Sequence, residues 1–373
     1  MTTTKMHRAG RAFAVAVALV AMMLTADPAA AEYKFNDSHF HLTNYIQEGT
    51  PIDDYVDIMG DVVKRSTLFG IPLQQMWDYG NTGDFAPWYY LQTDAPLYYY
   101  SFTDAFIAMQ YLSQPEDVRK RLDPMITGFN PADMYAADHI RRVLLTFPGV
   151  FSGIGEFTIH KEFVSPKTAG GAASLSDPAL DRIFDFCAES GLLAILHNDI
   201  DMPFPKDGQD PYILAQLKDL FRRHQDTTII WAHAGLGRVV RPVEDQVAII
   251  KKALDDPKLN HVYIDISWDE VAKYVTESPE SLRKAADLIR SEPDRFLFGS
   301  DCVAPSSIDN QLAVYELYAP LWKELGPEIT KKVCLDNYER LFDAARAKVR
   351  AWEKANKGKT GPMPKPSPAS GYR

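Results

Sequence analysis

Short apolar runs alternate with longer segments of helical periodicity from residue 33 to about residue 300. Segments between the runs carry helix signals: Ser176-Asp177-Pro178 offers a cap and a first-turn proline to a segment that Gly191 ends. Alternation of this kind predicts a parallel sheet covered by helices on both faces. Eight runs have the length and composition of buried strands, and they open at Tyr33, Thr67, Met125, Phe151, Leu192, Thr228, Val262 and Phe296.

Eight strand–helix units predict an α/β fold, a (β/α)8 TIM barrel, over residues 32–355. A doubly wound open sheet is the alternative, but no Gly-x-Gly-x-x-Gly motif follows an early strand. After the first strand, the sequence predicts a helix over Ile52–Lys64 and then the second strand over Ser66–Ile71, which Pro72 ends. A pair of terminal helices is expected from Asp309 to Lys354.

An aromatic-rich insertion of about residues 72–123 follows the second predicted strand. Twelve aromatic side chains lie between Met76 and Tyr111, interrupted by proline and glycine. The stretch is longer than an ordinary connection, for which the median is about 4–6 residues. It suits either a lid that supplies aromatic walls to a pocket, or a small satellite core or dimer contact, and both interpretations stay open.

The first 31 residues predict a secretory signal peptide. Three basic residues precede the apolar run Phe13–Leu24, and Ala29–Ala31 offers a cleavage site before Glu32. The run is shorter than the roughly 20 residues that span a bilayer, so we expect no stable membrane anchor. Because Arg8 and Arg11 are not adjacent, the signal fits the Sec route, and the protein is expected to be secreted into a periplasm. Residues 356–373 predict a disordered tail.

Composition narrows the range of partners. The net charge of −10 over 373 residues argues against a nucleic-acid surface, which needs clustered Lys and Arg, and leaves a small-molecule substrate as the expected partner. The three cysteines lack CxxC spacing, and none is interpreted as a nucleophile. No sequence pattern encodes the oligomeric state, so a homo-oligomer is possible.

Metal-binding side chains stand at the ends of five predicted strands. His39 and His41 share one face because strand side chains alternate. In a (β/α)8 barrel the active site lies at the carboxyl ends of the strands, so these residues should converge. Imidazole and carboxylate groups are ligands of divalent metals. The predicted metal site comprises His39, His41, Glu156, His197, His233 and Asp301.

Three further residues are candidates for substrate binding. Arg238 follows the sixth strand and would bind a substrate carboxylate or form a surface ion pair. His160 follows the fourth strand and either reaches the pocket or lies in a surface loop. Trp268 follows the seventh strand and either lines the pocket or packs in the core. Partners that orient the imidazoles are expected among Asn198, Asp199 and Ser300.

The sequence from Asp37 to the segment Asn337–Phe342 resembles the amidohydrolase superfamily, and within it the amidohydrolase-related (amidohydrolase 2) branch. The shared residues are the His-x-His of strand one, His197, His233 and Asp301. The resemblance implies a metal-dependent hydrolase on a (β/α)8 barrel or, in some members, a non-oxidative decarboxylase.

The resemblance leaves the number of metal ions open. Many binuclear members carry a carbamylated lysine at strand four, whereas Glu156 stands there in this chain, as in members with a glutamate bridge. Lys161 lies beyond the strand and is not assigned the bridge. A mononuclear site of His39, His41, His197 and Asp301 fits equally, with His233 left to act on the substrate.

These observations predict a hydrolase that uses a metal-bound hydroxide to cleave a lactone, ester or amide bond. Asp301 would bind the metal and move the proton, and His233 would bind a second ion or polarise the scissile carbonyl. Zinc is the first candidate, although mixed nitrogen and oxygen ligands also suit Mn, Fe and Ni. The rival functions are a decarboxylase on the same scaffold and a catalytically silent binding protein, which would have lost some of the six side chains.

Overall fold

The computed structural model describes residues 33–204, 206, 208–209, 211–243 and 246–358. The predicted signal peptide and residues 359–373 of the predicted tail lie outside the described residues. Within the described ranges, no helix combines the length and the apolar character needed to cross a bilayer.

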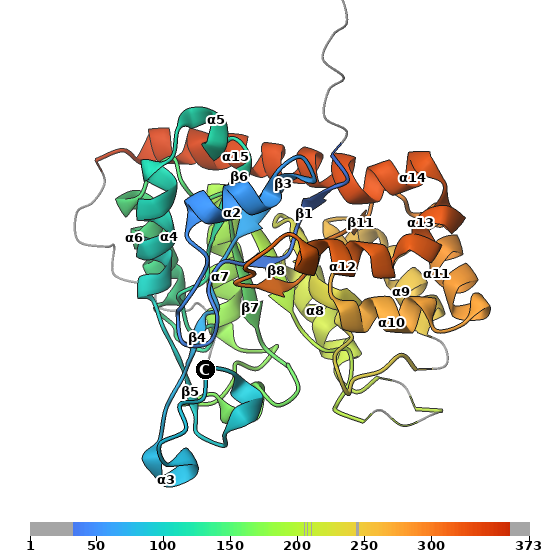
Figure 1. Ribbon diagram of the computed structural model, residues 1–373, viewed down its shortest axis with the longest axis horizontal. Coiled ribbons are helices and arrows are strands. Elements are labelled where there is room, and N and C mark those ends of the chain that lie inside the picture. Colours follow the sequence, from blue (N-terminus) through green and yellow to red (C-terminus); the bar gives the residue numbers. More distant parts are fainter. Residues whose placement is uncertain (1–32, 205, 207, 210, 244–245, 359–373) are drawn as a thin grey trace, which may run out of the picture. The chain divides into compact units, whose positions relative to one another are not determined.

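Eight parallel strands form a curled sheet, surrounded by helices (Figure 1). They follow one another around the sheet in chain order, and each corresponds to one of the eight predicted runs. The predicted TIM-barrel architecture is therefore confirmed. The strands are β1 (Phe35–Asp37), β3 (Val63–Leu68), β6 (Leu122–Ile126), β7 (Gly153–Thr158), β8 (Leu193–His197), β9 (Ile229–Trp231), β10 (Val262–Asp265) and β11 (Phe296–Leu297).

The first and last strands of this sheet meet at a seam. Beyond them, β2 (Phe40–His41) pairs in parallel with β12 (Cys302–Val303). The Ser38 amide donates to the Phe298 carbonyl over 3.2 Å, and the Asp301 amide donates to the His39 carbonyl over 2.8 Å. The two ends of the sheet are thus joined beside two of the predicted metal ligands.

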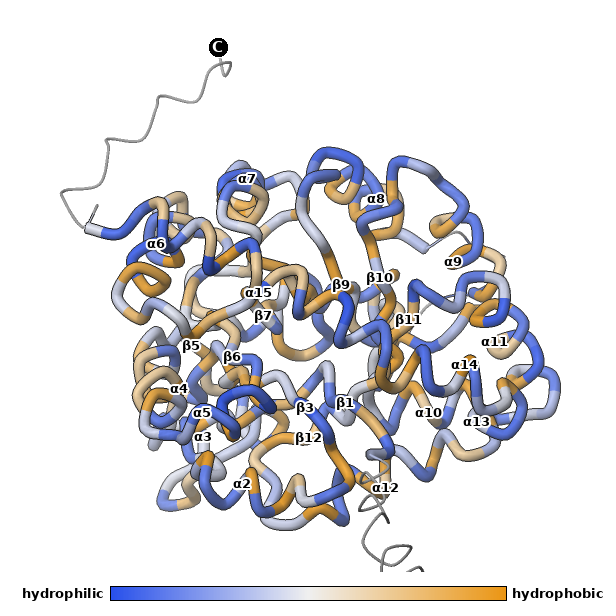
Figure 2. The backbone as a smooth tube through the Cα atoms, turned by 90° about the horizontal axis from the view of Figure 1, so that it is seen from above, coloured by the Kyte–Doolittle hydropathy of each residue, from blue (hydrophilic) through white to orange (hydrophobic). Residues whose placement is uncertain are grey.

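Helices cover the outer face of the sheet (Figure 2), and their buried apolar side chains belong to the main hydrophobic core. The predicted start and end of α7 are observed. The Asp177 side chain accepts a hydrogen bond from the Ala179 amide, and Gly191 ends the helix in the left-handed conformation. Helix α10 was not predicted. The covering helices are α2 (Ile52–Met59), α4 (Phe102–Ser113), α6 (Ala136–Thr146), α7 (Pro178–Ser190), α8 (Leu214–Arg223), α9 (Gln246–Leu254), α10 (Asp269–Thr276) and α11 (Pro279–Ser291).

The boundaries predicted between the first helix and the second strand are wrong. Helix α2 ends at Met59 rather than Lys64, because Gly60 takes a positive φ of 44° that a helix cannot continue through. The chain turns there, so β3 begins at Val63, three residues before the predicted start of the strand.

The segment between β3 and β6 contains a small layer of its own. Strand β4 (Leu73–Gln75) pairs antiparallel with β5 (Leu97–Tyr99), and α3 (Tyr79–Thr82) lies between them. Leu73 of β4 and Leu97 of β5 form a satellite core with Tyr45, Tyr90 and Val164. Helix α4 and the short α5 (Glu116–Arg119) then lead back to β6. Single 3-10 turns occur at Tyr90–Gln92, Ser165–Lys167, Ala232–Gly235 and Pro257–Leu259.

The C-terminal segment forms four helices rather than the predicted pair. These are α12 (Asp309–Leu317), α13 (Ala319–Leu325), α14 (Pro327–Lys331) and α15 (Asn337–Asn356), the last entered through a π-helical turn at Lys332–Asp336. Tyr338, Leu341 and Phe342 of α15 pack with strand residues such as Met125 and Leu193 in one buried cluster. This packing fills the interior of the sheet, so the curled sheet encloses a core and not a channel.

Candidate metal centre

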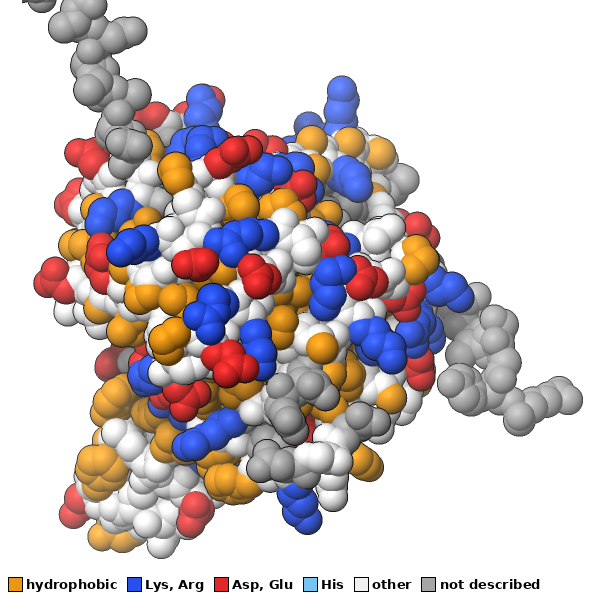
Figure 3. All heavy atoms as spheres, turned by 90° about the vertical axis from the view of Figure 1, so that its right-hand side faces the viewer, with side chains coloured by type: hydrophobic (Ala, Val, Ile, Leu, Met, Phe, Trp, Pro, Cys, Tyr) orange, Lys and Arg blue, Asp and Glu red, His pale blue; other side chains and the backbone are white. Residues whose placement is uncertain are grey.

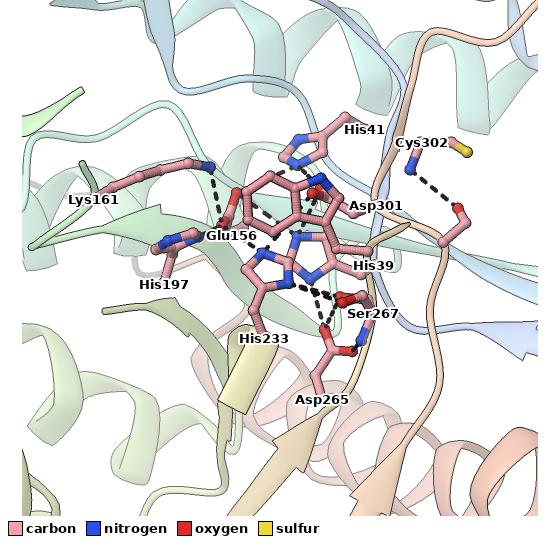
Figure 4. A network of polar contacts seen from close by, with 12 residues as sticks. His39, His41, Glu156, Lys161, His197, His233, Asp265, Ser267, Asp301 and Cys302 are labelled. Carbon is pink, nitrogen blue, oxygen red and sulfur yellow. Dashed lines mark hydrogen bonds and ion pairs between the residues drawn. The ribbon is translucent and has the colours of Figure 1, made fainter. Parts of the chain in front are cut away.

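The structure brings the six predicted metal-binding residues together at the carboxyl ends of the strands (Figure 4). His39 lies between β1 and β2, and His233 lies in the turn after β9. Ligand atoms of His39, Glu156 and His233 lie within 4.8 Å of one another, and so do those of His39, His41 and Asp301. Either group supplies enough donors for a metal ion.

The two carboxylates are the centre of the arrangement. Asp301 Oδ1 lies 3.4 Å from His39 Nε2 and 3.2 Å from His41 Nε2. Glu156 Oε2 lies 3.3 Å from His41 Nε2, and Glu156 Oε1 lies 2.6 Å from His197 Nδ1. His233 Nε2 is more distant, at 3.8 Å from Glu156 Oε1 and 3.9 Å from Asp301 Oδ2. Four imidazoles therefore face one pair of carboxylates.

Three of the four rings are anchored through their other nitrogen. His39 Nδ1 lies 2.6 Å from Asp265 Oδ2, and Ser267 Oγ lies 3.0 Å from His233 Nδ1. His197 Nε2 lies 3.1 Å from Asp199 Oδ1, as expected for Asp199. Such contacts select the tautomer and orient the ring, as carboxylates do behind metal-bound histidines. The nitrogens that remain, two Nε2 and one Nδ1, face Glu156 and Asp301.

Among the described residues, neither of the remaining predicted partners forms a hydrogen bond with an imidazole. The Ser300 hydroxyl donates to Asp37 Oδ2 over 2.6 Å, and the Asn198 amide donates to the Asp199 carbonyl. Asp37 also accepts from the backbone amides of His39 and Ser300, so it holds the two sides of the seam together. For Ser300 and Asn198 the expectation is wrong, because their side chains are used by nearer carboxylate and backbone acceptors.

The donor set fits a divalent metal. His39 Nε2 and His233 Nε2 are buried and have no hydrogen-bond partner among the described residues. Leaving a buried polar atom unpaired is costly, and native structures rarely do so without a reason such as an ion. Both atoms face carboxylate oxygens, and the combination of neutral imidazoles with carboxylates is a common ligand set for zinc and related metals.

Electrostatic interactions keep both carboxylates ionised. Burial raises the pKa of Glu156, but Lys161 and His197 outweigh burial and hold this pKa well below its usual range. Burial likewise opposes ionisation of Asp301, yet the neighbouring His39 and His41 lower its pKa. Burial lowers the pKa of His39, but Asp301 and Asp265 more than compensate and raise it. Both carboxylates are therefore ionised and can serve as anionic ligands of a cation.

Backbone strain is concentrated at the same place. His233, Ala234 and Asp301 have φ values of 58°, 52° and 53°, a left-handed region that residues other than glycine seldom occupy. Strain of this kind persists where the surrounding structure requires it, and it clusters at functional sites. Here it accompanies two of the six predicted ligands.

Lys161 is the residue of this site that sequence reasoning set aside. Its side chain is only 10% exposed, and its Nζ lies 3.8 Å from Glu156 Oε1 (Figure 4). The same Nζ lies 6.0 Å from the ring centroid of Trp268, which packs against His233 at 5.0 Å. Lys161 lies in a turn after β7, and its ammonium reaches the centre only through a long flexible side chain. No local sequence pattern therefore predicts that it lies beside Glu156.

The candidate substrate-binding residues behave differently from one another. Arg238 stacks on Trp268 at 5.2 Å, donates to the Tyr89 hydroxyl over 2.9 Å and lies 3.5 Å from Glu270. Trp268 is buried beside His233, so it borders the centre. The His160 ring makes no hydrogen bond or ion pair with the six candidate ligands in the described part of the chain.

A family model described as amidohydrolase matches residues 37–344. An amidohydrolase from Burkholderia multivorans with bound zinc is 13% identical, with 83% of this chain and 99% of that chain covered and a TM-score of 0.48. Amidohydrolase 2 from Bifidobacterium longum subsp. infantis is 14% identical, with 84% and 99% covered and a TM-score of 0.46. 5-Carboxyvanillate decarboxylase from Sphingomonas paucimobilis is 17% identical, with 75% of this chain and 79% of that chain covered and a TM-score of 0.42. No curated protein matches the chain.

Proposed function

Because the chain belongs to the amidohydrolase 2 family of the amidohydrolase superfamily, we propose that it is a secreted metal-dependent hydrolase that cleaves a lactone, ester or amide bond of a small substrate. The family is a scaffold for metal-dependent hydrolases and decarboxylases. One observation supports metal-dependent chemistry most directly: the buried, unpartnered Nε2 atoms of His39 and His233 face the ionised carboxylates of Glu156 and Asp301.

One or two divalent ions, zinc first, would be held by the six strand-end residues. A bound ion would supply Lewis-acid chemistry, polarising a carbonyl and lowering the pKa of a bound water to roughly 7. The described residues contribute orientation: Asp265, Asp199 and Ser267 each contact one ring nitrogen of an imidazole, and the other ring nitrogen is then turned toward Glu156 and Asp301.

Asp301 is proposed as the proton carrier. Its side chain is 10% exposed, whereas the side chains of the other five candidate ligands are at most 3% exposed, so it retains the best access to an arriving substrate. Because neighbouring imidazoles lower its pKa, it stands ionised and can accept a proton. Returning this proton to the leaving group would complete a general acid–base cycle.

Substrate would be held on the side of the centre where Trp268, Arg238 and Lys161 lie. Trp268 offers an aromatic surface beside His233, and Arg238 would bind a carboxylate in a forked geometry. A buried ammonium such as that of Lys161 favours an anionic or strongly polarised group. Because the same ammonium would attract a substrate carboxylate, decarboxylation of a small carboxylic acid is the second candidate function.

Metal content per chain tests the centre. Elemental analysis of the wild-type protein should find one or two divalent ions, and a fall from two to one in Glu156→Ala would establish the bridge. Glu280→Ala is the matched control, because the Glu280 side chain is 69% exposed on α11. A wild-type protein that binds no divalent metal, even after reconstitution, would remove the proposal.

A substrate panel separates the two reactions. We expect acid release in a pH-stat from lactones, esters or amides, and no CO2 release from carboxylated aromatics. CO2 release without hydrolysis would select the decarboxylase instead. The proposed export is checked independently by the mass of the mature protein, which should begin at Glu32 in the periplasmic fraction.

A further inference from the structure

Helix α4 is apolar on the side that faces solvent as well as on the side that faces the barrel. Thr103, Ile107, Ala108 and Tyr111 are buried against the fold. The opposite side exposes 57% of Phe102, 36% of Phe106, 57% of Met109 and 46% of Leu112, with Ala105 between them. No Asp, Glu, Lys or Arg lies on this outer side. A helix that is apolar all round is normally buried, so this surface requires a cover.

The exposed apolar surface continues beyond α4. Met134 and Tyr135 end the loop that enters α6, and they are 41% and 61% exposed. Asp104 of α4 accepts hydrogen bonds from Thr127 and Gly128 in the same loop, and Figures 1 and 2 both show α6 beside α4. We call the surface formed by Phe102, Phe106, Met109, Leu112, Met134 and Tyr135 the α4 face.

Its composition differs from the rest of the surface. In the described chain, twelve of the eighteen large apolar side chains that are clearly exposed lie between residues 77 and 135. No Lys or Arg occurs from Ser66 to Val118. By contrast, Figure 3 shows basic and acidic side chains interspersed over the side of the molecule that carries α9, α11 and α13. Enrichment in aromatic residues and Met with depletion of charge marks the cores of protein interfaces.

We propose that the α4 face is the interface of a homodimer, in which α4 of one copy packs antiparallel against α4 of a second copy. Residues 102, 106 and 109 follow the four–three spacing of a helix–helix seam. A two-fold interface places the same surface on both sides, and an uncharged surface can pair with itself without like-charge repulsion. A partner of opposite charge would have nothing to recognise on this face.

The available area suits a dimer of modest affinity. A side chain of this size exposes roughly 150–250 Å² in full, so six that are about half exposed offer on the order of 600 Å² from each copy. Stable interfaces bury about 800 Å² per partner. We therefore expect a dimer that dissociates in the micromolar range, and the dimer does not depend on the proposed catalytic function.

Sedimentation velocity of the full mature chain from about 1 to about 100 µM tests the interface, over the range in which a micromolar dimer dissociates. The wild type should shift from monomer to dimer with rising concentration. Met109→Lys and Phe106→Lys place a charge within the seam and should weaken dimerisation by at least about tenfold, the effect of roughly 1.4 kcal/mol. Leu317→Lys is the matched control, because Leu317 is 42% exposed on α12, outside the α4 face, and should leave dimerisation unchanged.

Two results would overturn the proposal. One is a wild type that stays monomeric at every concentration, including the case in which it binds phosphatidylcholine vesicles instead. The other is a dimer that both α4 variants leave intact. Circular dichroism shows whether each variant is folded. If both lysine variants are unfolded, Phe106→Cys provides the second measurement, because residue 106 is the middle of the seam and faces its own copy across the two-fold axis: the proposal requires an intermolecular disulfide on oxidation, and failure to form one contradicts it.

Discussion

At the scale of single residues, the candidate metal centre depends on side chains that contact the imidazoles but are not themselves among the six candidate ligands. Asp265, Asp199 and Ser267 each hold one nitrogen of an imidazole, and the ring then has only one nitrogen left for a metal. Orienting the ring and binding the metal are thus the work of different groups: the anchoring side chain fixes the ring, and the ring nitrogen that remains would bind the ion. The anchoring residues can therefore be tested separately from the ligands.

Asp265→Asn should weaken metal binding without removing a ligand. The amide can still accept one hydrogen bond, but it lacks the charge that raises the basicity of the His39 ring, so we expect metal affinity to fall about 10- to 100-fold. Competition with a chelator measures the change. Asp287→Asn is the control, because Asp287 is 73% exposed in an ion pair with Arg290. An affinity equal to that of the wild type would contradict the anchoring role.

Asp301→Asn should abolish the proposed proton transfer. An asparagine cannot take up the proton, and general acid–base groups contribute about 10²- to 10⁴-fold to rates, so kcat should fall within this range. The measurement is kcat on the substrate that the panel identifies, alongside metal content. Loss of metal together with activity would show that ligation dominates at this position, whereas an unchanged kcat would exclude Asp301 from catalysis.

The sequence indicated the six strand-end residues because strand periodicity and barrel topology place such residues at one edge. Asp265 was missed although it also ends a strand, because its carboxylate points to His39 Nδ1 from behind the ring. The roles of Ser267 and Lys161 could not be predicted from the sequence for another reason. Each lies in a turn, and its role follows from a tertiary contact that no local pattern records.

At the scale of elements, capping and close packing decide where helices end. Gly191 ends α7 with a φ of 81°, and a Cβ there would collide with Lys348 of α15. Gly170 has a similar φ of 85°, but a Cβ there would meet open space. Substituting each of the two glycines therefore distinguishes the cost of backbone strain, which both share, from the cost of a steric clash between α7 and α15, which only Gly191 has.

Gly191→Ala should destabilise the fold more than Gly170→Ala. Both alanines adopt a left-handed conformation at a cost of roughly 1–2 kcal/mol, and only Ala at 191 also displaces α15, which adds about 1–3 kcal/mol of overpacking. Urea unfolding measures both free energies. Equal losses would show that α15 shifts without cost.

Asp104 should make stability depend on pH. Burial raises its pKa to about 7, despite hydrogen bonds from Thr127 and Gly128 that favour the charged form. The folded state then holds a proton between about pH 4 and pH 7 that the unfolded state, with a pKa near 3.9, has released. The free energy of unfolding should fall as pH rises through this window, by up to about 1.4 kcal/mol per pH unit.

Asp104→Asn removes this contribution, because an amide does not titrate. Urea unfolding at pH 5, 6 and 7 should give a flatter pH dependence for the variant than for the wild type. Identical slopes for the two proteins would mean that Asp104 is already ionised at pH 5, held so by its hydrogen bonds from the loop.

Strands were more predictable than helices in this chain. A buried strand is a short apolar run, and all eight runs became strands, whereas α10 begins directly after Trp268 with the mixed sequence Asp269–Thr276 and went unnoticed. The four C-terminal helices were merged into two for a similar reason. Their boundaries are set by packing against the barrel and by a π-helical turn, not by strong stop signals.

At the scale of the whole molecule, the seam between β1 and β11 links the start and the end of the barrel. Asp37 and Ser300 are separated by 263 positions along the chain, yet they share hydrogen bonds. Closing so long a loop carries an entropic cost and delays the contacts that complete the sheet. The predicted ligands His39 and Asp301 lie on opposite sides of this junction.

This junction has a consequence for biosynthesis. While the ribosome is still translating, His39 and His41 stand at an open edge, and the aspartate that would complete their coordination has not been made. A nascent or truncated polypeptide thus lacks the donor group of His39, His41 and Asp301, and only a chain that reaches residue 301 can offer all six candidate ligands. Metal loading would then report on how far synthesis has proceeded: a product that stops before residue 301 should bind divalent metal more weakly than the finished chain, because one of the two donor groups is missing.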